Sequence, residues 1–472
     1  MALRRPFSFI VVILFLCSLA VTSAGAISIT QVNRRLISES AILIDADTGQ
    51  ILFEKDMHRV LRPASITKVM TALLALENGE LSDTITVSRA ALRPIPPDAY
   101  KVPFLIGEEI TLEQAMYANA MVSAADASNC IAEYIGGTVD NFIELMNERA
   151  KELGALNTTF LNAHGMPDDG HLTTAYDMAQ IARAAVSTPG FNEIFSTHRY
   201  VMPPTNVQQT QRVFRNQNRM MTGAFVYEDL IAGKTGWTGI SQYTLFTAAR
   251  RDDRTLICIV MRSPKIDDKY KDTTMLLDYG FDEFKRVDFP IEELENYSFG
   301  DTGDREMNTE FVVYEAFSCL IPKSLSKDDI KVEYITEDGD VESELLVRIV
   351  FTLDAPGYWQ GVPELGEVTG AAQIIKEVVD DDTPDSDEEL TDPEEFPRPE
   401  WPVVSVGPPE LPPVIEGQTD DSANIYDQLY ELSSGWFAAI KDAVVVLVVL
   451  AIAICCIIVS KRKLRFDRNR SK

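Results

Sequence analysis

Three short motifs, met in a fixed order along the chain, constrain its fold and chemistry more than any other feature. They are Ser65-Ile66-Thr67-Lys68, then Ser123-Ala124-Ala125-Asp126, then Lys234-Thr235-Gly236. A serine with a lysine one helical turn later, a second serine, and a lysine on a glycine-flanked strand make an acyl-transfer site that needs no histidine. The combination predicts a serine acyl-enzyme hydrolase or a descendant of one.

Each motif alone would be a weak signal. A serine three residues before a lysine also occurs at Ser324 and Lys327, and again at Ser460 and Lys463 in a basic tail. Neither of these pairs has a companion motif, whereas Lys-Thr-Gly occurs only once in the chain. The order of the three motifs therefore carries the prediction, and the other two serine–lysine pairs are decoys.

The first motif opens an apolar, helix-capable run that follows Pro63. Residues three apart share one helix face, so the Lys68 amine can reach the Ser65 hydroxyl near the positive end of the helix dipole. Apolar neighbours and a second lysine, Lys234, would both favour a neutral Lys68 that can act as a base. For this motif alone, the alternative is an ordinary helix with a capping serine and a snorkelling lysine.

The third motif precedes two strand-like stretches, 243–249 and 255–261, which are joined by a polar turn at 250–254. Gly236 would allow a substrate backbone to lie close against an edge strand and pair with it. Lys234 and Thr235 would then face a substrate carboxylate. Taken alone, a hairpin with a surface lysine would explain the same residues.

On these motifs the chain resembles the penicillin-binding D-alanyl-D-alanine carboxypeptidases, the low-molecular-mass serine-type penicillin-binding proteins of bacterial cell walls. The likeness covers roughly residues 35 to 285. Further stretches that resemble the family are 41–52, Arg62-Pro63-Ala64 before the first motif, 107–112, Asn162-Ala163-His164-Gly165, 174–178 and 277–281.

The resemblance implies a role for each motif residue. Ser65 would attack the carbonyl between the last two D-alanines of a peptidoglycan stem peptide, Lys68 would take its proton, and Ser123 would relay a proton to the leaving amine. The resemblance also implies that β-lactams would acylate Ser65. No metal or cofactor is expected. The residues expected to bind substrate are Lys234 and Thr235 at the carboxylate, Gly236 beside it, and Trp237, whose amide would share the oxyanion hole with that of Ser65.

The second motif departs from the family pattern at one position. An asparagine usually stands where this chain has Ala125, and Asn129, one helical turn later, is the residue that could substitute for it. Loss of a buried amide that bonds both lysine and substrate costs a few kcal/mol, or roughly 10²-fold in rate. The family also often has an arginine ahead of the closing helix, and here only Lys269 or Lys271 could serve.

The predicted fold class is α+β, with a serine β-lactamase/transpeptidase-like antiparallel sheet flanked by helices. A largely helical subdomain would carry Ser123, and a small all-β domain, a disordered acidic stalk and one C-terminal transmembrane helix would follow. The expected segments are a signal peptide (1–26), the catalytic domain (27–287), the β-rich domain (288–378), an acidic Pro-rich linker (379–435), the transmembrane helix (436–460) and a basic cytoplasmic tail (461–472).

The two ends of the chain predict an extracytoplasmic enzyme held in the bacterial cell membrane by a single span. Arg4 and Arg5 precede an apolar run, and small residues at 24–26 offer a cleavage site. Residues 443–459 are uniformly apolar and basic residues follow them, which places the tail in the cytoplasm. The net charge of −29, with an acidic stretch at 377–400, argues against nucleic-acid binding and favours a solvated spacer.

The cysteines and histidines suggest neither a disulfide framework nor a metal site nor a Ser-His-Asp triad. Cys130, Cys258 and Cys319 are expected to be separate thiols, the first two of them buried, and His164 is expected to be structural in its turn.

Three alternatives remain beside a carboxypeptidase. A serine β-lactamase shares the fold but needs a fast deacylating carboxylate, and a D,D-endopeptidase would use the same residues on cross-links. The third is a catalytically impaired peptidoglycan-binding or sensing homologue, which Ala125 favours and which the intact Ser65, Lys68 and Lys234 oppose.

Overall fold

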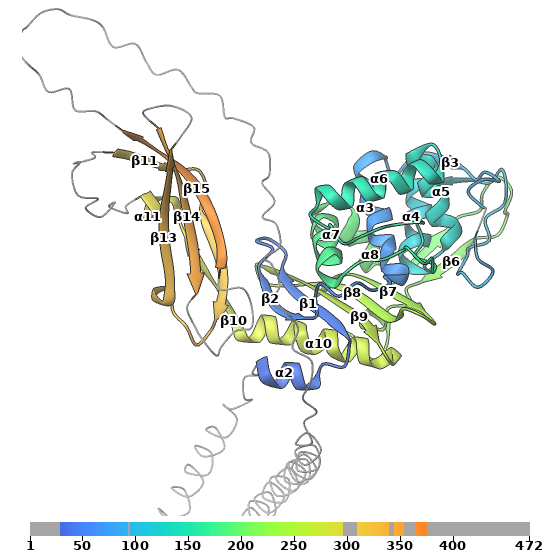
Figure 1. Cartoon of the computed structure of the whole chain (residues 1–472). Coiled ribbons are helices and arrows are strands. Elements are labelled where there is room, and N and C mark those ends of the chain that lie inside the picture. Colours follow the sequence, from blue (N-terminus) through green and yellow to red (C-terminus); the bar gives the residue numbers. More distant parts are fainter. Residues whose placement is uncertain (1–28, 93–94, 296–308, 339–343, 354–363, 375–472) are drawn as a thin grey trace, which may run out of the picture. The chain divides into compact units, whose positions relative to one another are not determined.

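A five-stranded antiparallel sheet forms the centre of residues 29–283 (Figure 1). The computed structural model of this chain describes residues 29–92, 95–295, 309–338, 344–353 and 364–374. The predicted signal peptide, acidic linker, transmembrane helix and tail lie outside these residues. Among the residues described, no helix is long and apolar enough to cross a membrane. The sheet has the order β2 (Ile51–Lys55), β1 (Ser40–Asp45), β9 (Arg254–Ser263), β8 (Gln242–Arg251) and β7 (Leu230–Thr238).

Alternation along the strands gives the sheet two apolar faces. In β1, Ile42 and Ile44 join the core on one face, whereas Ala41 and Leu43 join the core on the other. Successive strand side chains point to opposite faces, so a strand that is apolar at every position must be covered on both sides. The sequence pattern of a continuous apolar strand thus requires helices above and below the sheet.

Helices cover both faces, as Figure 1 shows. One face carries a helical subdomain, and the other packs against the long helix α10 with the short α2. This arrangement confirms the predicted α+β class with a helix-flanked antiparallel sheet. The helices are α2 (Ile29–Arg35), α3 (Lys68–Asn78), α4 (Leu112–Met121), α5 (Ala125–Gly136), α6 (Val139–Glu152), α7 (Ala175–Ser187), α8 (Phe191–Ser196), α9 (Arg219–Thr222) and α10 (Ile266–Glu283).

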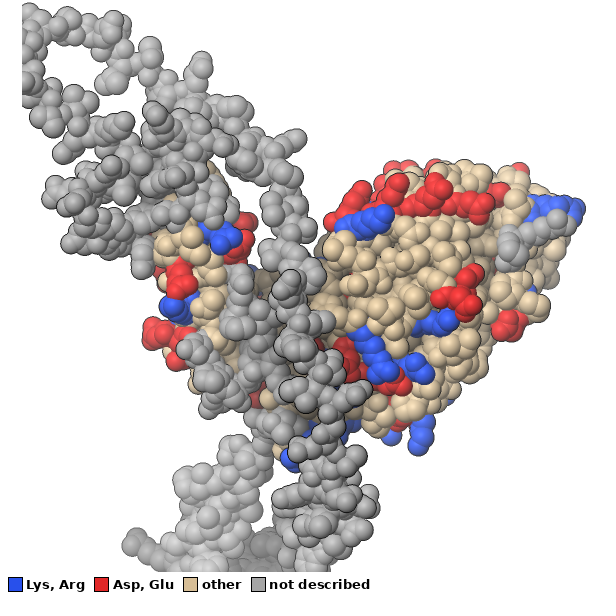
Figure 2. All heavy atoms as spheres, viewed as in Figure 1, with Lys and Arg blue, Asp and Glu red and all other residues tan. Residues whose placement is uncertain are grey.

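Two small hairpins belong to the helical side of the sheet. β3 (Thr84–Thr86) pairs with β4 (Glu109–Thr111), and β5 (Arg199–Met202) pairs with β6 (Arg212–Arg215). On the face viewed in Figure 2, acidic side chains gather along the side where Figure 1 places α6. The α6 sequence explains this, because acidic residues recur every four positions on its exposed stripe: Asp140, Glu144, Glu148 and Glu152.

The hairpin after the third motif differs slightly from the prediction. The turn was expected at 250–254, but β8 continues to Arg251 and β9 begins at Arg254. Only Asp252 and Asp253 remain in the turn, and Asp252 has a φ of 56°. A two-residue connection with positive φ matches the twist of the flanking strands, so the arginines extend the ladder.

The later residues form a second β-rich part with its own core. β10 (Phe284–Phe289) pairs with β12 (Phe317–Pro322), so the boundary expected between 287 and 288 falls inside a strand. A four-stranded sheet has the order β11 (Thr309–Val313), β15 (Glu364–Ile374), β14 (Glu344–Leu353) and β13 (Ile330–Asp338), with α11 (Ile291–Glu295) and the 3-10 turn η2 (Lys327–Asp329) nearby in sequence. Cys130, Cys258 and Cys319 are free and buried, as predicted for the first two.

Candidate active site

Ser65 lies in a tight turn rather than in the expected α-helix. Residues Ala64–Thr67 form the 3-10 turn η1, and α3 begins only at Lys68. Ala64 has a φ of 52°, a conformation that costs a residue with a Cβ free energy. The Thr67 hydroxyl donates to the Ala64 carbonyl at 2.9 Å, which helps to hold this turn closed. The half-buried Ser65 thus sits at the start of a buried helix, as the motif required.

Lys68 is buried, with only 1% of its surface exposed. Its amine donates a hydrogen bond of 2.5 Å to the His164 carbonyl. The pKa of this amine is held well below its usual value, first by burial and then by the nearby charge of Lys234, against a smaller opposing effect of Asp126. A neutral amine one turn from a serine hydroxyl is what a general base for that hydroxyl requires.

The segment that contains His164 and His171 supports both residues of the first motif. His171 accepts from the Leu161 N–H at its Nδ1, at 3.0 Å, which leaves its proton on Nε2 to donate to the Thr67 hydroxyl at 2.8 Å. Gly165 has a φ of 79°, and a Cβ there would lie 1.9 Å from the Ala64 carbonyl oxygen. No motif in the sequence marked His171 for this role.

Burial keeps both histidines neutral. It lowers the pKa of His164 to about 3 and that of His171 to about 3. The Nδ1 of His164 accepts from the Met166 N–H, so its ring is engaged in its own turn. This matches the structural role predicted for His164.

Ser123 lies two residues before the start of α5, a helix that packs against α3. Its φ is 59°, and its buried hydroxyl has no protein hydrogen-bond partner among the described residues. Two residues after it, the Ala125 N–H donates to the Tyr100 carbonyl at 2.7 Å. The buried Asp126 carboxylate accepts from the Val102 and Phe104 N–H groups, both at distances near hydrogen-bond length. The hydroxyl is therefore available for a substrate or a proton relay.

The structure does not let Asn129 replace the amide that Ala125 lacks. The Asn129 amide nitrogen donates to the Ala91 carbonyl at 3.0 Å, and Ala125 itself is buried. The asparagine that contacts Lys68 is Asn119, whose amide donates to the Lys68 carbonyl at 3.3 Å. It binds the main chain of α3, so the Lys68 amine is left with the His164 carbonyl.

The third motif lies on β7, which is an edge strand of the sheet, as predicted. Lys234 is buried and donates to the Thr235 carbonyl at 3.0 Å, and burial together with Lys269 lowers its pKa to about 7. A Cβ on Gly236 would lie 2.3 Å from the Thr244 hydroxyl and 2.9 Å from the Ser65 nitrogen. The glycine is therefore required by the close approach of β7 to the Ser65 turn, a reason that the sequence did not reveal.

Beyond the motif, Trp237 and Lys269 extend the same edge. Trp237 is 57% exposed, and its ring lies 6.0 Å from that of Tyr243. Lys269 is buried on α10 with its amine 5.4 Å from the Tyr243 ring, and burial followed by Arg219 lowers its pKa to about 7. Lys271 is exposed, so Lys269 is the residue of the expected pair whose charge reaches Lys234.

The described residues thus bring the first and third motifs together through the Ser65 turn, Lys68 and β7, with Ser123 at the start of the neighbouring helix. Within the same residues, no group of three or more histidine, cysteine or acidic side chains could hold a metal ion. A serine beside a neutral amine, next to a cationic strand edge, is suited to nucleophilic attack on a substrate that carries a carboxylate.

Comparison with known proteins identifies a family whose chemistry agrees with this site. The profile of the S11 peptidases, described as D-alanyl-D-alanine carboxypeptidase, matches residues 27–265. The chain is 30% identical over 310 residues to D-alanyl-D-alanine carboxypeptidase DacF of Bacillus subtilis, covering 64% of this chain and 77% of that protein. It is 29% identical over 328 residues to DacC of Escherichia coli, covering 66% and 78%.

Solved structures agree in fold. The D-alanyl-D-alanine carboxypeptidase DacD of Francisella tularensis matches with a TM-score of 0.59 at 21% identity, over 72% of this chain and 93% of that one. A mutant of the Streptomyces K15 DD-transpeptidase matches with a TM-score of 0.50 at 27% identity, over 52% and 98%.

Proposed function

The chain belongs to the D-alanyl-D-alanine carboxypeptidase family of serine peptidases, and from this premise we propose that Ser65 carries its acyl-enzyme. The reaction is hydrolysis of the bond between the last two D-alanines of a peptidoglycan stem peptide. β-Lactams, which imitate that dipeptide, would acylate the same serine. The observation that carries the proposal is the buried Lys68 amine, one turn from Ser65, whose pKa is lowered by burial and by Lys234, which favours the neutral form that can accept a proton.

Each proposed step uses a group of this chain. The Ser65 hydroxyl oxygen attacks the carbonyl carbon while the Lys68 amine takes its proton. Ser123 relays a proton to the departing D-alanine nitrogen, so the peptide bond breaks and an ester on Ser65 remains. A water then attacks the ester, giving the shortened peptide and free Ser65. The amides of Ser65 and Trp237 would stabilise the oxyanion at each addition.

The strand edge would select the substrate. Lys234 and Thr235 would bind the terminal carboxylate, and Gly236 keeps β7 close to the Ser65 turn, with a Ser65 nitrogen 2.9 Å from a hypothetical Cβ. A dipeptide in extended form could add to β7 because that strand has a free edge in the sheet. A substrate whose terminal carboxylate is blocked should therefore be hydrolysed more slowly.

A second candidate function rests on Ala125. Without an asparagine amide at this position, the cleft could retain peptidoglycan binding and acylation by penicillin with little turnover. The two candidates differ in whether D-alanine is released.

The decisive experiment treats the purified full-length chain with a fluorescent penicillin and, separately, with a stem pentapeptide. The carboxypeptidase predicts an adduct on Ser65 by mass analysis, together with release of D-alanine. Ser65→Ala should abolish both, whereas the decoy change Ser324→Ala should alter neither. Labelling without D-alanine release would favour the binding candidate, and labelling that persists in Ser65→Ala would overturn the assignment of the nucleophile.

For the location of the enzyme we propose a cell-membrane anchor with the catalytic part outside the cytoplasm. The support is the sequence of the ends: signal-like residues 1–26, a spacer at 379–435, an apolar run within 436–460 and a basic tail at 461–472. Removing residues 436–472 should move the protein from the membrane fraction to the soluble fraction without changing its rate on a soluble pentapeptide. Retention in the membrane fraction would contradict the anchor.

A further inference from the structure

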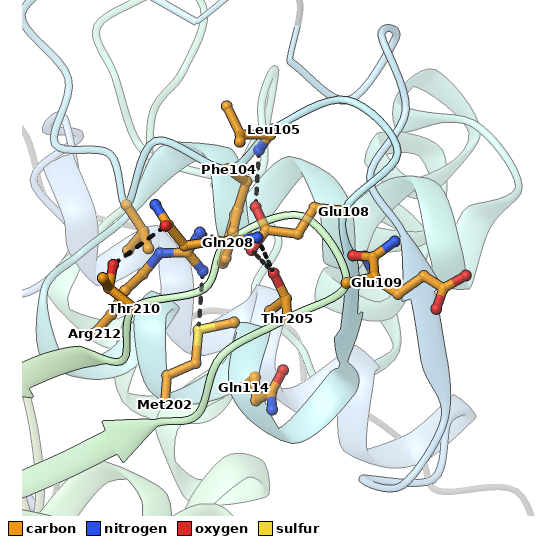
Figure 3. Close-up of polar contacts among 12 residues, drawn as sticks. Phe104, Leu105, Glu108, Glu109, Gln114, Met202, Thr205, Gln208, Thr210 and Arg212 are labelled. Carbon is orange, nitrogen blue, oxygen red and sulfur yellow. Dashed lines mark hydrogen bonds and ion pairs between the residues drawn. The ribbon is translucent and has the colours of Figure 1, made fainter.

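A buried ion pair joins Glu108, which lies between the first and second motifs in sequence, to Arg212, which lies between the second and third, and the proposed chemistry does not use it. Glu108 is fully buried, and its carboxylate accepts from the Arg212 guanidinium at 2.7 Å (Figure 3). The same carboxylate oxygen accepts from the Thr205 hydroxyl at 2.9 Å, and the other accepts from the Leu105 N–H at 2.9 Å. Every strong bond of this carboxylate is thus made to the 100–106 segment or to the β5–β6 hairpin and its loop.

Arg212 ties the hairpin to the same segment a second time. It begins β6, and its guanidinium carbon lies 5.3 Å from the centre of the Phe104 ring. Asn206, in the hairpin loop, accepts from the Glu109 N–H and donates to the Gly107 carbonyl, both at 2.9 Å. The hairpin and its loop therefore contact Phe104, Gly107 and Glu109 in addition to Glu108.

The same segment also forms hydrogen bonds with the start of α5. The Tyr100 carbonyl accepts from the Ala125 N–H, and the Val102 and Phe104 N–H groups donate to Asp126. These contacts fall two and three residues after Ser123, at the first turn of α5. A series of contacts thus leads from the hairpin through Glu108, Leu105 and Phe104 to Asp126, three residues after Ser123.

We propose that the Glu108–Arg212 ion pair is a positioning device that holds the 100–105 segment against α5 and thereby keeps Ser123 in its acylation geometry. The inference rests on the proposed function, in which Ser123 serves acylation. Glu108 and Arg212 are positioning residues, since neither touches the three motifs.

Two properties favour such a device. Val102 and Phe104 are buried, but Tyr100, Leu105 and Ile106 are 66%, 47% and 51% exposed, so the segment has apolar anchors at two positions and needs polar contacts for the rest of its backbone. Ser123 has a positive φ, 59°, and a hydroxyl without a protein partner among the described residues, so its own contacts do not hold it. Residues in such conformations persist only where the surroundings over-determine them.

The test measures the second-order rate constant for acylation of the full-length chain by a fluorescent penicillin, with the thermal midpoint recorded for each variant. Glu108→Gln should lower the rate constant by roughly tenfold, because a small displacement of a reacting group is costly. If that variant fails to fold, the pair Glu108→Gln with Arg212→Met removes both charges and relieves the buried guanidinium. It should regain stability and still acylate slowly.

A kinetic cycle separates positioning from general damage. In a Ser123→Ala background, Glu108→Gln should change the acylation rate by less than about twofold, because coupled residues are non-additive. The matched control is Glu77→Gln, which breaks an Arg149–Glu77 ion pair of the same 2.7 Å length elsewhere and should leave the rate unchanged.

Each outcome has a distinct meaning. An equal loss in both backgrounds would overturn the positioning proposal, as would a normal rate in the doubly substituted chain. If Ser123→Ala alone left acylation unchanged, the proposed role of Ser123 in acylation would be wrong. The positioning proposal, which depends on that role, would then be overturned as well.

Discussion

Position 125 shows how one missing amide changes the surroundings of the Lys68 amine. That amine has the His164 carbonyl as its hydrogen-bond partner, and the neighbouring Asn129 is committed to Ala91. Nothing on α5 therefore donates to or accepts from the amine in the described contacts. We therefore expect the residue exchange to act on the reaction through the orientation of Lys68 and of the bound peptide.

Restoring the amide should help the reaction. Ala125→Asn is expected to raise the acylation rate constant for a fluorescent penicillin by roughly tenfold, the value of one hydrogen bond to a charged or reacting group. Ala125→Leu has a similar volume without an amide and should lower the rate. A neutral or harmful effect of a folded Ala125→Asn would mean that the cleft has been rebuilt around alanine.

The two neighbouring amines of Lys234 and Lys269 predict a specific pH dependence. Burial and the charge of Lys269 lower the pKa of Lys234 to about 7, so its cationic form, which would bind the carboxylate, is lost as the pH rises through that value. Removing a like charge raises the pKa of the remaining amine. In Lys269→Met, the alkaline limb of kcat/KM for a pentapeptide should therefore move up by as much as about one pH unit.

The exposed neighbour supplies the control for this measurement. Lys271→Met removes a charge from the same helix but from a side chain in solvent, where screening is strong, so its pH profile should match the parent chain. An alkaline limb that stays in place in Lys269→Met, or moves down, would show that Lys269 does not act on Lys234.

At the scale of elements, the site depends on how closely β7 approaches the Ser65 turn. Gly236→Ala would place a methyl group 2.9 Å from the Ser65 nitrogen and 2.3 Å from the Thr244 hydroxyl, so the strand or the turn must move. We expect acylation to fall by about 10²-fold, because a shift of about 1 Å is enough for such a loss. Gly239→Ala, one residue beyond the end of the strand, meets nothing within 4 Å and should acylate normally. Equal rates for the two variants would contradict the close approach.

The same elements show what sequence could and could not predict. The helix-flanked antiparallel sheet followed from the family resemblance, and the edge position of Lys234 was predicted with the third motif. The 3-10 turn at Ser65 was missed because it depends on a φ of 52° at Ala64, which is supported by Thr67, His171 and the close packing of Gly165. The His171–Thr67 and Gly165–Ala64 contacts join residues about one hundred positions apart, and no local pattern records them.

The ion pair between Glu108 and Arg212 could not be predicted from the sequence either. Glu108 and Arg212 are 104 residues apart, and each looks like an ordinary surface residue in the sequence. The engagement of Asn129 elsewhere was hidden for a similar reason, since only the tertiary structure brings the Ala91 carbonyl to that amide. Motif chemistry could be predicted, whereas the support of the motifs could not.

At the scale of the whole molecule, the two edges of the central sheet have different partners. β7 forms one edge and carries the third motif, and β2 forms the other. Beside β2, the buried Gln50 donates to the Leu320 carbonyl and accepts from the Leu320 N–H, both at 2.7 Å. These two bonds join the β1–β2 turn to β12 of the β-rich part, at the edge opposite to β7.

This separation predicts that stability and acylation can be altered independently. Gln50→Glu keeps the shape of the side chain but sets a carboxylate against the Leu320 carbonyl, so one hydrogen bond becomes a repulsion in a buried place. The free energy of unfolding should fall by about 1–3 kcal/mol, measured by denaturant titration of the full-length chain. Acylation by penicillin below the unfolding transition should be unchanged, because three strands separate the turn from β7 in the sheet order. The exposed change Gln209→Glu should affect neither quantity. A loss of acylation in folded Gln50→Glu would instead mean that the β12 contact acts on the site through the sheet.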